Sequence, residues 1–337
     1  MRATQVTESL KVLIKSRRPG YVWGPPGVGK SALVHAAAAE LDMQVIDLRA
    51  VLLDPVDLRG LPVPDGDVVH WKPPGFLPIR GRMGRPGVIF ADELAQAPAA
   101  VQAAFLQGVL DHRIGETELD PNWTWIAASN RQEDRAGANR VITPLLNRFV
   151  HIDLEVSNDD WHAWAASSGV HPSVRAFLRW RPNLLMAFDA SRNERAFPTP
   201  RSWDFLSRLL PQTPEHLIFP IAMGTVGEAA AAEFQAFNEV YMALPDIDKL
   251  LAAPDKAPVP KGHPSVLYAL VGAISARCKD AKPALLSNVV KYVMRLPQEF
   301  SVLLMRDAQA VNEGLVKVPE AGKWLLANRD VFPNLNR

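Results

Sequence analysis

The chain has 337 residues, of which 48% are hydrophobic and 22% are charged, a composition typical of a globular protein with about two or three domains. No apolar run approaches the roughly 20 residues that cross a bilayer, so we expect a soluble protein without membrane insertion. A formal net charge of +1 excludes a broad basic surface of the kind that binds nucleic-acid phosphates autonomously.

Two features of the chain indicate the cytoplasm. Residues 1–20 place charges on both sides of a short apolar patch, which is typical of an amphipathic helix rather than a signal peptide. Cys278 is the single cysteine, so it forms no internal disulfide, in agreement with a reducing compartment. We therefore expect a cytoplasmic protein with a free structural thiol.

Short β-branched runs alternate with longer helical patterns in the first half of the chain. This alternation predicts an α/β fold in which helices flank a parallel sheet. Strands buried on both faces also explain why the runs are apolar throughout. The runs are YVWG (21–24), SALVHAAAAELD (31–42), QVIDLRA (44–50), GVIFADE (87–93), APAAVQAAFLQGVLDH (97–112), WTWIAASN (123–130) and RFVHIDLE (148–155).

A segment rich in proline and glycine, residues 52–87, separates two of the predicted strands. Loops of this length are uncommon unless they are functional. PDGD at 64–67 has the composition of a hairpin turn between arms at 61–63 and 68–71. Further along, the segment holds an arginine cluster that is either a solvated loop or a contact surface, formed by Arg80, Arg82 and Arg85.

The pattern becomes helical after Glu155. Helical stretches alternate with proline-bearing breaks, and a linker-like segment at 244–264 precedes the last helices, so we place a boundary near Pro245. We predict three parts: an α/β core at 1–155, an all-α domain at 156–245 and a C-terminal helical extension at 246–337.

The segment WGPPGVGKS contains the pattern G-x-x-x-x-G-K-[ST], with an apolar strand before it and a helix after it. Its glycines allow backbone N–H groups to surround phosphate oxygens, and the following helix presents the positive end of its dipole. Lys30 would bridge the outer phosphates of ATP, and Ser31 would place its hydroxyl on Mg²⁺. The alternative is a simple glycine-rich turn. The predicted phosphate-binding residues are Gly24, Pro25, Pro26, Gly27, Val28, Gly29, Lys30, Ser31 and Ala32.

An acidic pair ends the apolar strand VIFADEL. Asp92 would hold Mg²⁺ directly or through water, and Glu93 would orient and deprotonate the attacking water. An acidic pair after a strand is weak evidence for a catalytic site when it stands alone, but it is strong evidence when it follows a phosphate loop in the chain.

Two later residues complete the predicted catalytic set of Lys30, Glu93, Asn130 and Arg148. Asn130 ends the strand WTWIAASN, where a neutral amide holds the lytic water without adding negative charge; the alternative is a cap of the following turn. Arg148 precedes the last strand and would neutralise charge on a phosphoryl group in its own chain or a neighbour; the alternative is a surface salt bridge.

Other chemistries have little support. The eight histidines are scattered without an H-E-x-x-H pattern or cysteine pairs, which does not favour a protein-bound zinc site. No Ser-His-acid set is suggested, and we interpret Ser129 as packing at the end of a strand. Trp123 and Trp125 on one strand face predict core or interface packing, as do the helix-spaced Trp161 and Trp164.

The order GPPGVGKS, ADE, AASN, LLNRF and PTPRSW resembles the AAA+ ATPases, which are P-loop NTPases, and within them the MoxR-like group. DLRG at 57–60, WKPPGFL, DELAQAP and VQAAFLQGVLDHR are similar to that group's characteristic stretch. The resemblance covers about Pro19 to Leu210, and the remaining residues match no family pattern that we identify.

The resemblance implies an ATPase that closes into a homo-oligomeric ring, commonly a hexamer, with ATP and Mg²⁺ between subunits. Arg148 would then act on the neighbour's nucleotide, and Arg201 of PTPRSW would touch the phosphates from a helical lid. The segment around Leu61 to Trp71 would be the insert that faces the pore or a partner. Members of this group resemble chaperones that activate metal-containing enzymes, often with a partner bearing a von Willebrand factor A domain.

The chain departs from the group's pattern at a few positions. Leu94, Ala95 and Gln96 stand where I-N-R is common, which removes an arginine able to contact the adjacent subunit. Arg131 replaces a proline, and Asn147 stands where an aspartate is common. These changes affect subunit contacts, while the phosphate loop and the acidic pair are intact.

Three hypotheses follow. The first is an ATP-hydrolysing ring motor that remodels or activates a protein partner. The second is a nucleic-acid motor of a restriction, defence or replication assembly, for which the Arg80–Arg85 cluster is the one supporting feature and which the neutral net charge does not favour. The third is a scaffold that binds nucleotide without turnover, and the intact acidic pair argues against it.

Overall fold

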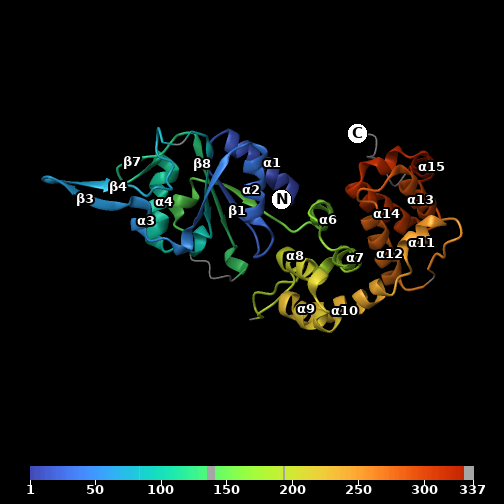
Figure 1. The fold of residues 1–337 in the computed structure, drawn as a ribbon. Helices are drawn as coiled ribbons and strands as arrows, with labels where there is room; N and C mark the ends of the chain where they lie inside the picture. Colours follow the sequence, from blue (N-terminus) through green and yellow to red (C-terminus); the bar gives the residue numbers. More distant parts are fainter. Residues whose placement is uncertain (83, 135–140, 193, 261, 330–337) are drawn as a thin grey trace. The chain divides into compact units, whose positions relative to one another are not determined.

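The computed structural model describes residues 1–337 except 83, 135–140, 193, 261 and 330–337 (Figure 1). The chain divides into two compact units, Met1–Ser157 with Asp189–Asn193, and Asn158–Phe188 with Glu194–Arg337. Each unit has its own hydrophobic core.

A parallel sheet of five strands forms the centre of the first unit, in the order β2-β5-β8-β1-β9. The two strands β5 and β8 are buried along their whole lengths, which accounts for their unbroken apolar sequences. The strands are β1 (Gly20–Trp23), β2 (Gln44–Arg49), β5 (Gly87–Asp92), β8 (Trp123–Ser129) and β9 (Val150–Asp153). The predicted α/β fold class is confirmed.

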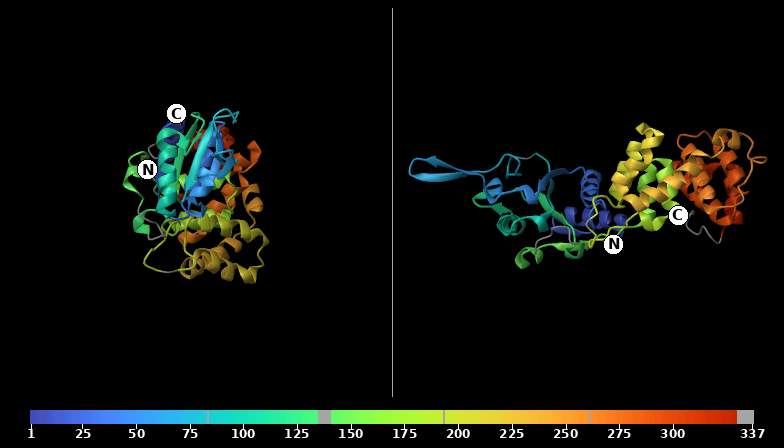
Figure 2. Two further views of the ribbon diagram at one scale, coloured as in Figure 1. Left: turned by 90° about the vertical axis from the view of Figure 1, so that its left-hand side faces the viewer. Right: turned by 90° about the horizontal axis from the view of Figure 1, so that it is seen from below.

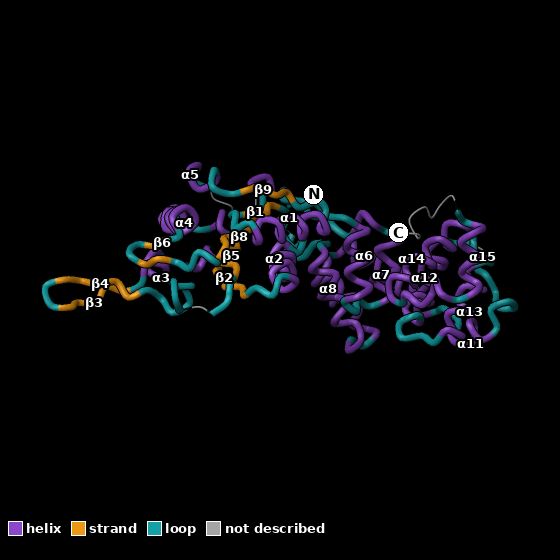
Figure 3. Tube along the Cα trace, turned by 90° about the horizontal axis from the view of Figure 1, so that it is seen from above, coloured by secondary structure: helices purple, strands orange, loops and turns teal. Residues whose placement is uncertain are grey.

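Helices cover both faces of this sheet, with α2 and α4 on opposite sides of the strands in Figure 3. Alternate residues of β5 point to opposite faces of the sheet. Val88 and Phe90 pack in the cluster with α1 and α2, while Ile89 and Ala91 pack in the cluster with α4. The helices of this unit are α1 (Ala3–Lys15), α2 (Lys30–Glu40), α3 (Pro55–Arg59), α4 (Ala99–Asp111) and α5 (Thr143–Leu146).

The predicted hairpin is confirmed and extends away from the sheet (Figures 1 and 2). It consists of β3 (Leu61–Asp65) and β4 (Val68–Lys72), with Asp65 paired to Val68 across the turn. A glycine is required at its base, because a Cβ on Gly60 would lie 1.9 Å from the Lys72 carbonyl oxygen. A second short hairpin joins β6 (Arg113–Ile114) and β7 (Thr117–Glu118).

The second unit is helical. An aromatic group formed by Phe177, Trp203, Phe234 and Phe237 packs α7, α8 and α10 together, and a separate cluster joins α11 to α15. The helices are α6 (Asn158–Ser167), α7 (Pro172–Trp180), α8 (Pro200–Leu209), α9 (Ile218–Val226), α10 (Glu228–Met242), α11 (Ile247–Ala252), α12 (Pro264–Arg277), α13 (Pro283–Val293), α14 (Gln298–Val311) and α15 (Pro319–Ala327).

The helices expected to form a lid and an extension belong to one compact unit. Helix α12 packs against both α7 and α14, and the approach to α7 is close because Gly272 has no Cβ to meet Ala176. The first boundary, predicted after residue 155, lies near the end of the first unit at Ser157. A further division near Pro245 stays a prediction.

Several buried side chains occupy the positions expected of packing residues. Trp123 and Trp125 are fully buried, and Trp125 makes an edge contact with Phe105 of α4. Cys278 is a buried free thiol, as predicted. Within the described part of the chain, every helix is too short or too polar to span a bilayer, and the cytoplasmic location stays a prediction.

Candidate nucleotide-binding site

The phosphate loop connects β1 to α2. Gly27 and Gly29 have φ angles of 73° and 100°, a region that glycine adopts without steric cost. Gly29 is the N-cap of α2, so no side chain competes for the amides of the first helical turn. The loop therefore presents backbone N–H groups and the positive end of a helix dipole to an anion.

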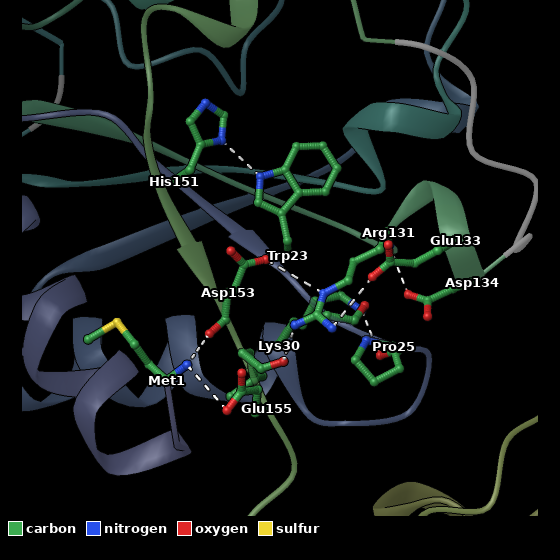
Figure 4. Close-up of polar contacts among 12 residues, drawn as sticks. Met1, Trp23, Pro25, Lys30, Arg131, Glu133, Asp134, His151, Asp153 and Glu155 are labelled. Carbon is green, nitrogen blue, oxygen red and sulfur yellow. Dashed lines mark hydrogen bonds and ion pairs between the residues drawn. The ribbon is translucent and has the colours of Figure 1, made fainter.

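Lys30 is the most buried cationic side chain of this loop, with 9% of its surface exposed. Its ammonium donates hydrogen bonds to the Gly24 carbonyl oxygen at 2.7 Å and to Asn130 Oδ1 at 2.8 Å. It also donates to the Pro25 carbonyl oxygen at 2.9 Å, and Lys30 and Pro25 are labelled in Figure 4. Lys30 and Asn130, which are 100 positions apart in sequence, thus meet at one edge of the sheet. When a nucleotide binds, phosphate oxygens would replace these oxygen atoms as acceptors of hydrogen bonds from the Lys30 ammonium.

Ser31 and Asp92 lie side by side at the same edge. The Ser31 hydroxyl donates to Asp92 Oδ2 at 2.8 Å, and Asp92 is 4% exposed. A hydroxyl and a carboxylate are the hard oxygen donors that Mg²⁺ prefers when it is bound together with phosphates. The two predicted metal ligands are therefore close enough to fit one ion.

The described residues hold no group of three or more His, Cys, Asp or Glu side chains placed to bind a metal ion.

Glu93 has a left-handed backbone conformation, with φ 59° and ψ 33°. Its amide donates to Asp92 Oδ1 at 3.0 Å, so the two acids share one tight turn after β5. Non-glycine residues with positive φ are uncommon, and such strain is concentrated at functional sites. Four other non-glycine residues that the structure describes also have a positive φ, so the conformation does not identify a catalytic residue and the role of Glu93 stays a prediction.

Ser129 braces this turn, as a buried residue at the end of β8. Its Oγ accepts a hydrogen bond from the Ala95 amide at 2.8 Å, lies 2.8 Å from the Tyr21 hydroxyl and donates to the Ala128 carbonyl oxygen at 2.7 Å. Burial raises the pKa of Tyr21, so this phenol stays protonated. Ser129 is a packing residue, as predicted, and the sequence gives no sign of its contact with Ala95.

Arg49 is a residue of the site that the sequence analysis missed. It ends β2 in register with Asp92, and its Nη1 lies 3.5 Å from Asp92 Oδ2. In the sequence, Arg49 can be recognised only as a basic residue at the end of a strand, and its role becomes visible once that strand is known to pair with the strand that ends in Asp92.

Arg131 follows Asn130 and faces the end of β9 (Figure 4). Its Nη2 donates to the Leu154 carbonyl oxygen at 3.1 Å, and its Nε lies 3.6 Å from Asp153 Oδ1. Arg131 therefore links the loop after β8 to the end of β9, shortly before the first unit ends at Ser157.

Arg148 lies near the amino ends of the strands, whereas the phosphate loop lies at their carboxyl ends. It precedes Val150, which pairs with Gly20 at the start of β1, whereas the phosphate loop follows the other end of β1. Strand residues rise about 3.3 Å each, so roughly 10 Å or more separates Arg148 from the phosphate loop of its own chain. Its guanidinium instead donates to the Pro144 carbonyl oxygen.

Arg201 is an exposed residue in the first turn of α8, in the second unit. The helix begins there because Thr199 and Ser202 form a reciprocal cap and Pro200 fills the first helical position. Its contact with a phosphate stays a prediction.

The arginine cluster Arg80, Arg82 and Arg85 is exposed. Arg80 Nη1 lies 3.4 Å from Glu118 and Arg85 Nη1 lies 3.9 Å from Asp42, so acids balance part of its charge.

Comparison with known proteins finds a family match at this site. Residues 21–61 match the family described as "ATPase family associated with various cellular activities (AAA)". A stretch of 37 residues is 49% identical to the replication factor C large subunit of Pyrobaculum calidifontis, covering 11% of this chain and 9% of that relative.

Comparison with solved structures matches a RuvB mutant of Thermotoga maritima, 19% identical over 80% of both chains with a TM-score of 0.43. NtrX from Brucella abortus in complex with ADP is 14% identical, with a TM-score of 0.42, and the similarity covers 96% of this chain and 67% of that one.

The parallel strand order, with a phosphate loop between β1 and α2, defines a P-loop NTPase. The family match covers the phosphate loop and the residues after it, so it agrees with this fold over that part of the chain. These features support nucleotide binding and ATPase activity in general.

Proposed function

We propose that the chain is a subunit of a MoxR-like ATPase ring, commonly a hexamer, that hydrolyses ATP to remodel or activate a protein partner. The observation that carries the proposal is the convergence of Lys30, Ser31, Asp92 and Asn130 at the carboxyl edge of the parallel sheet. The motif order of the MoxR-like group supports the finer assignment.

The residues of the site divide the work of phosphoryl transfer to water. The loop amides and Lys30 hold the phosphates, and Asn130 and Glu93 place the attacking water, with the Glu93 carboxylate accepting its proton. Mg²⁺, when held by Ser31 and Asp92, supplies positive charge to the outer phosphates. Exclusion of bulk water from the site would lower the effective dielectric constant and so strengthen each of these electrostatic interactions.

Arg148 acts on the nucleotide of a neighbouring subunit in this proposal. The position of Arg148 at the far end of β1 supports this, because a guanidinium there serves an adjacent phosphate loop better than its own. Arg201 would contact the phosphates, as the resemblance to the MoxR-like group implies.

The experiment is a mixing test with two inactive variants. Lys30→Ala cannot bind the phosphates in its own loop but keeps Arg148. Arg148→Ala keeps an intact phosphate loop but has no arginine to act on the neighbour's nucleotide. In randomly mixed rings about a quarter of the interfaces combine an intact loop with an intact arginine, so ATPase activity returns toward that fraction. Mixtures that assemble but stay inactive would count against a shared site.

The protein partner, either a client or a protein bearing a von Willebrand factor A domain, would bind the hairpin β3–β4 or the second unit. A nucleic-acid motor is the alternative, supported by the exposed arginines 80, 82 and 85. It predicts that DNA or RNA stimulates hydrolysis with a steep salt dependence. The acids beside Arg80 and Arg85 weaken that alternative.

A further inference from the structure

Arg49 contacts the carboxylate that we assign to Mg²⁺. Its Nη1 lies 3.5 Å from Asp92 Oδ2, and the parallel register places the two residues directly opposite each other at the ends of β2 and β5. The Asp92 side chain is 6% exposed and that of Arg49 is 52% exposed. A half-exposed cation thus lies beside a buried acid.

The contact involves the same oxygen that accepts the Ser31 hydroxyl at 2.8 Å. A cation placed there compensates the buried negative charge when no metal is bound. Two positive groups cannot share one carboxylate oxygen without repulsion, so Arg49 and Mg²⁺ compete for Asp92.

A second acid lies within reach of Arg49. Its Nε is 3.9 Å from Asp47 Oδ1, on the residue two positions earlier in β2 and therefore on the same face of the sheet. Asp47 also lies 3.3 Å from His35 Nε2. The Arg49 guanidinium has an alternative carboxylate to which it can move without leaving the sheet edge.

We propose that Arg49 is a positioning residue that neutralises Asp92 until Mg²⁺ arrives with ATP and then shifts to Asp47. This inference rests on the proposed function, because it needs Asp92 to be the metal-binding acid. Its consequence is that the metal binds poorly without nucleotide: the tethered cation disfavours Mg²⁺ alone, and the negative polyphosphate overcomes this repulsion.

The test is the ratio of the ATP dissociation constant in EDTA to that in Mg²⁺, measured by titration calorimetry. Arg49→Gln should raise this ratio about three- to fivefold, the upper range for a partly exposed ion pair. Arg49→Lys keeps the charge and should stay near the wild-type ratio. Arg80→Gln removes an exposed arginine from an ion pair outside the site and is the control.

Asp47→Asn is a second variant, for which we expect the ratio of the two dissociation constants to change in the opposite direction. Without Asp47 the guanidinium has one acceptor fewer, so it holds Asp92 more firmly and the ratio should fall below that of the wild type. In the absence of nucleotide, Mn²⁺ titrated by electron paramagnetic resonance should bind Arg49→Gln more tightly than the wild type.

The outcomes separate the two proposals. A wild-type chain that binds ATP equally in EDTA and Mg²⁺ contradicts the metal role of Asp92 and the proposed function. A wild-type chain with normal Mg²⁺ dependence, together with an unchanged ratio in both Arg49→Gln and Asp47→Asn, overturns the role of Arg49 alone. An equal rise in Arg80→Gln would also overturn it.

Discussion

The Ser31 hydroxyl donates a hydrogen bond of 2.8 Å to Asp92 and so joins the first turn of α2 to the carboxyl end of β5. The two residues are 61 positions apart and meet because parallel strands end at one edge of the sheet. This contact brings two hard oxygen ligands to the side of the phosphate loop, where the outer phosphates of ATP would lie.

Replacing Asp92 by Asn should weaken ATP binding in Mg²⁺ by about tenfold or more, a loss of at least ~1.4 kcal/mol, because the neutral amide is a poor ligand for a hard cation. Binding in EDTA should change little. Fluorescence titration with a labelled ATP analogue measures both constants. An equal loss in both conditions would show that Asp92 supports the loop rather than the metal.

Replacing Glu93 by Gln should leave ATP affinity near the wild-type value and lower the turnover rate by about 10²–10⁴-fold, the range for loss of a general base. Steady-state phosphate release and equilibrium ATP binding test the two parts separately. Glu116→Gln, at an exposed position, is the control and should keep full activity. Undiminished turnover in Glu93→Gln would exclude the base assignment.

Much of the site is predictable from the sequence because its chemistry depends on local patterns. The phosphate loop and the acidic pair are each contiguous, and each follows an apolar run that reads as a strand. Asn130 is predictable from its place at the end of the next strand. Its hydrogen bond to Lys30 confirms that these strands share an edge.

The contacts that were missed depend on register, which the sequence does not specify. Arg49 meets Asp92 because β2 pairs with β5 in one particular alignment. Ser129 meets the Ala95 amide because the turn after Glu93 bends toward β8, which a left-handed residue allows. The arrangement of helices after Pro245 depends on long-range packing such as that of Gly272 against Ala176.

Acid should destabilise the second unit through His162. This side chain is buried, and its pKa lies well below the usual value because of burial and the nearby Arg179, Arg175 and Arg306. The folded-state pKa is lower than the unfolded one near 6.5, so below that pH the unfolded chain binds a proton that the native chain refuses. The free energy of unfolding should therefore fall with decreasing pH, by up to about 1.4 kcal/mol per unit.

Urea unfolding at pH 7.5, 6.5 and 5.5 measures this slope. His162→Phe should reduce it by roughly one proton, while His171, whose pKa burial also lowers, leaves a smaller slope of the same sign. An identical pH dependence in wild type and His162→Phe would contradict the assignment.

Cys278 should be inert in the native chain. It is fully buried in the cluster of α11–α15, and burial raises its pKa to about 12, so very little thiolate exists at neutral pH. Ellman's reagent should react with the folded protein hardly at all and with one equivalent after addition of guanidinium chloride. Rapid reaction of the folded chain would show that this helical core opens readily.

The most direct test of the nucleotide site is calorimetric titration of the folded chain with ATP in the presence of Mg²⁺. We predict saturable binding of ATP by the wild type and loss of that binding in Lys30→Ala. The Lys30 ammonium contacts the carbonyl oxygens of Gly24 and Pro25 and the Asn130 side chain, and the variant lacks it. Absence of binding by the folded wild-type chain, alone and assembled with its partner, would contradict the account.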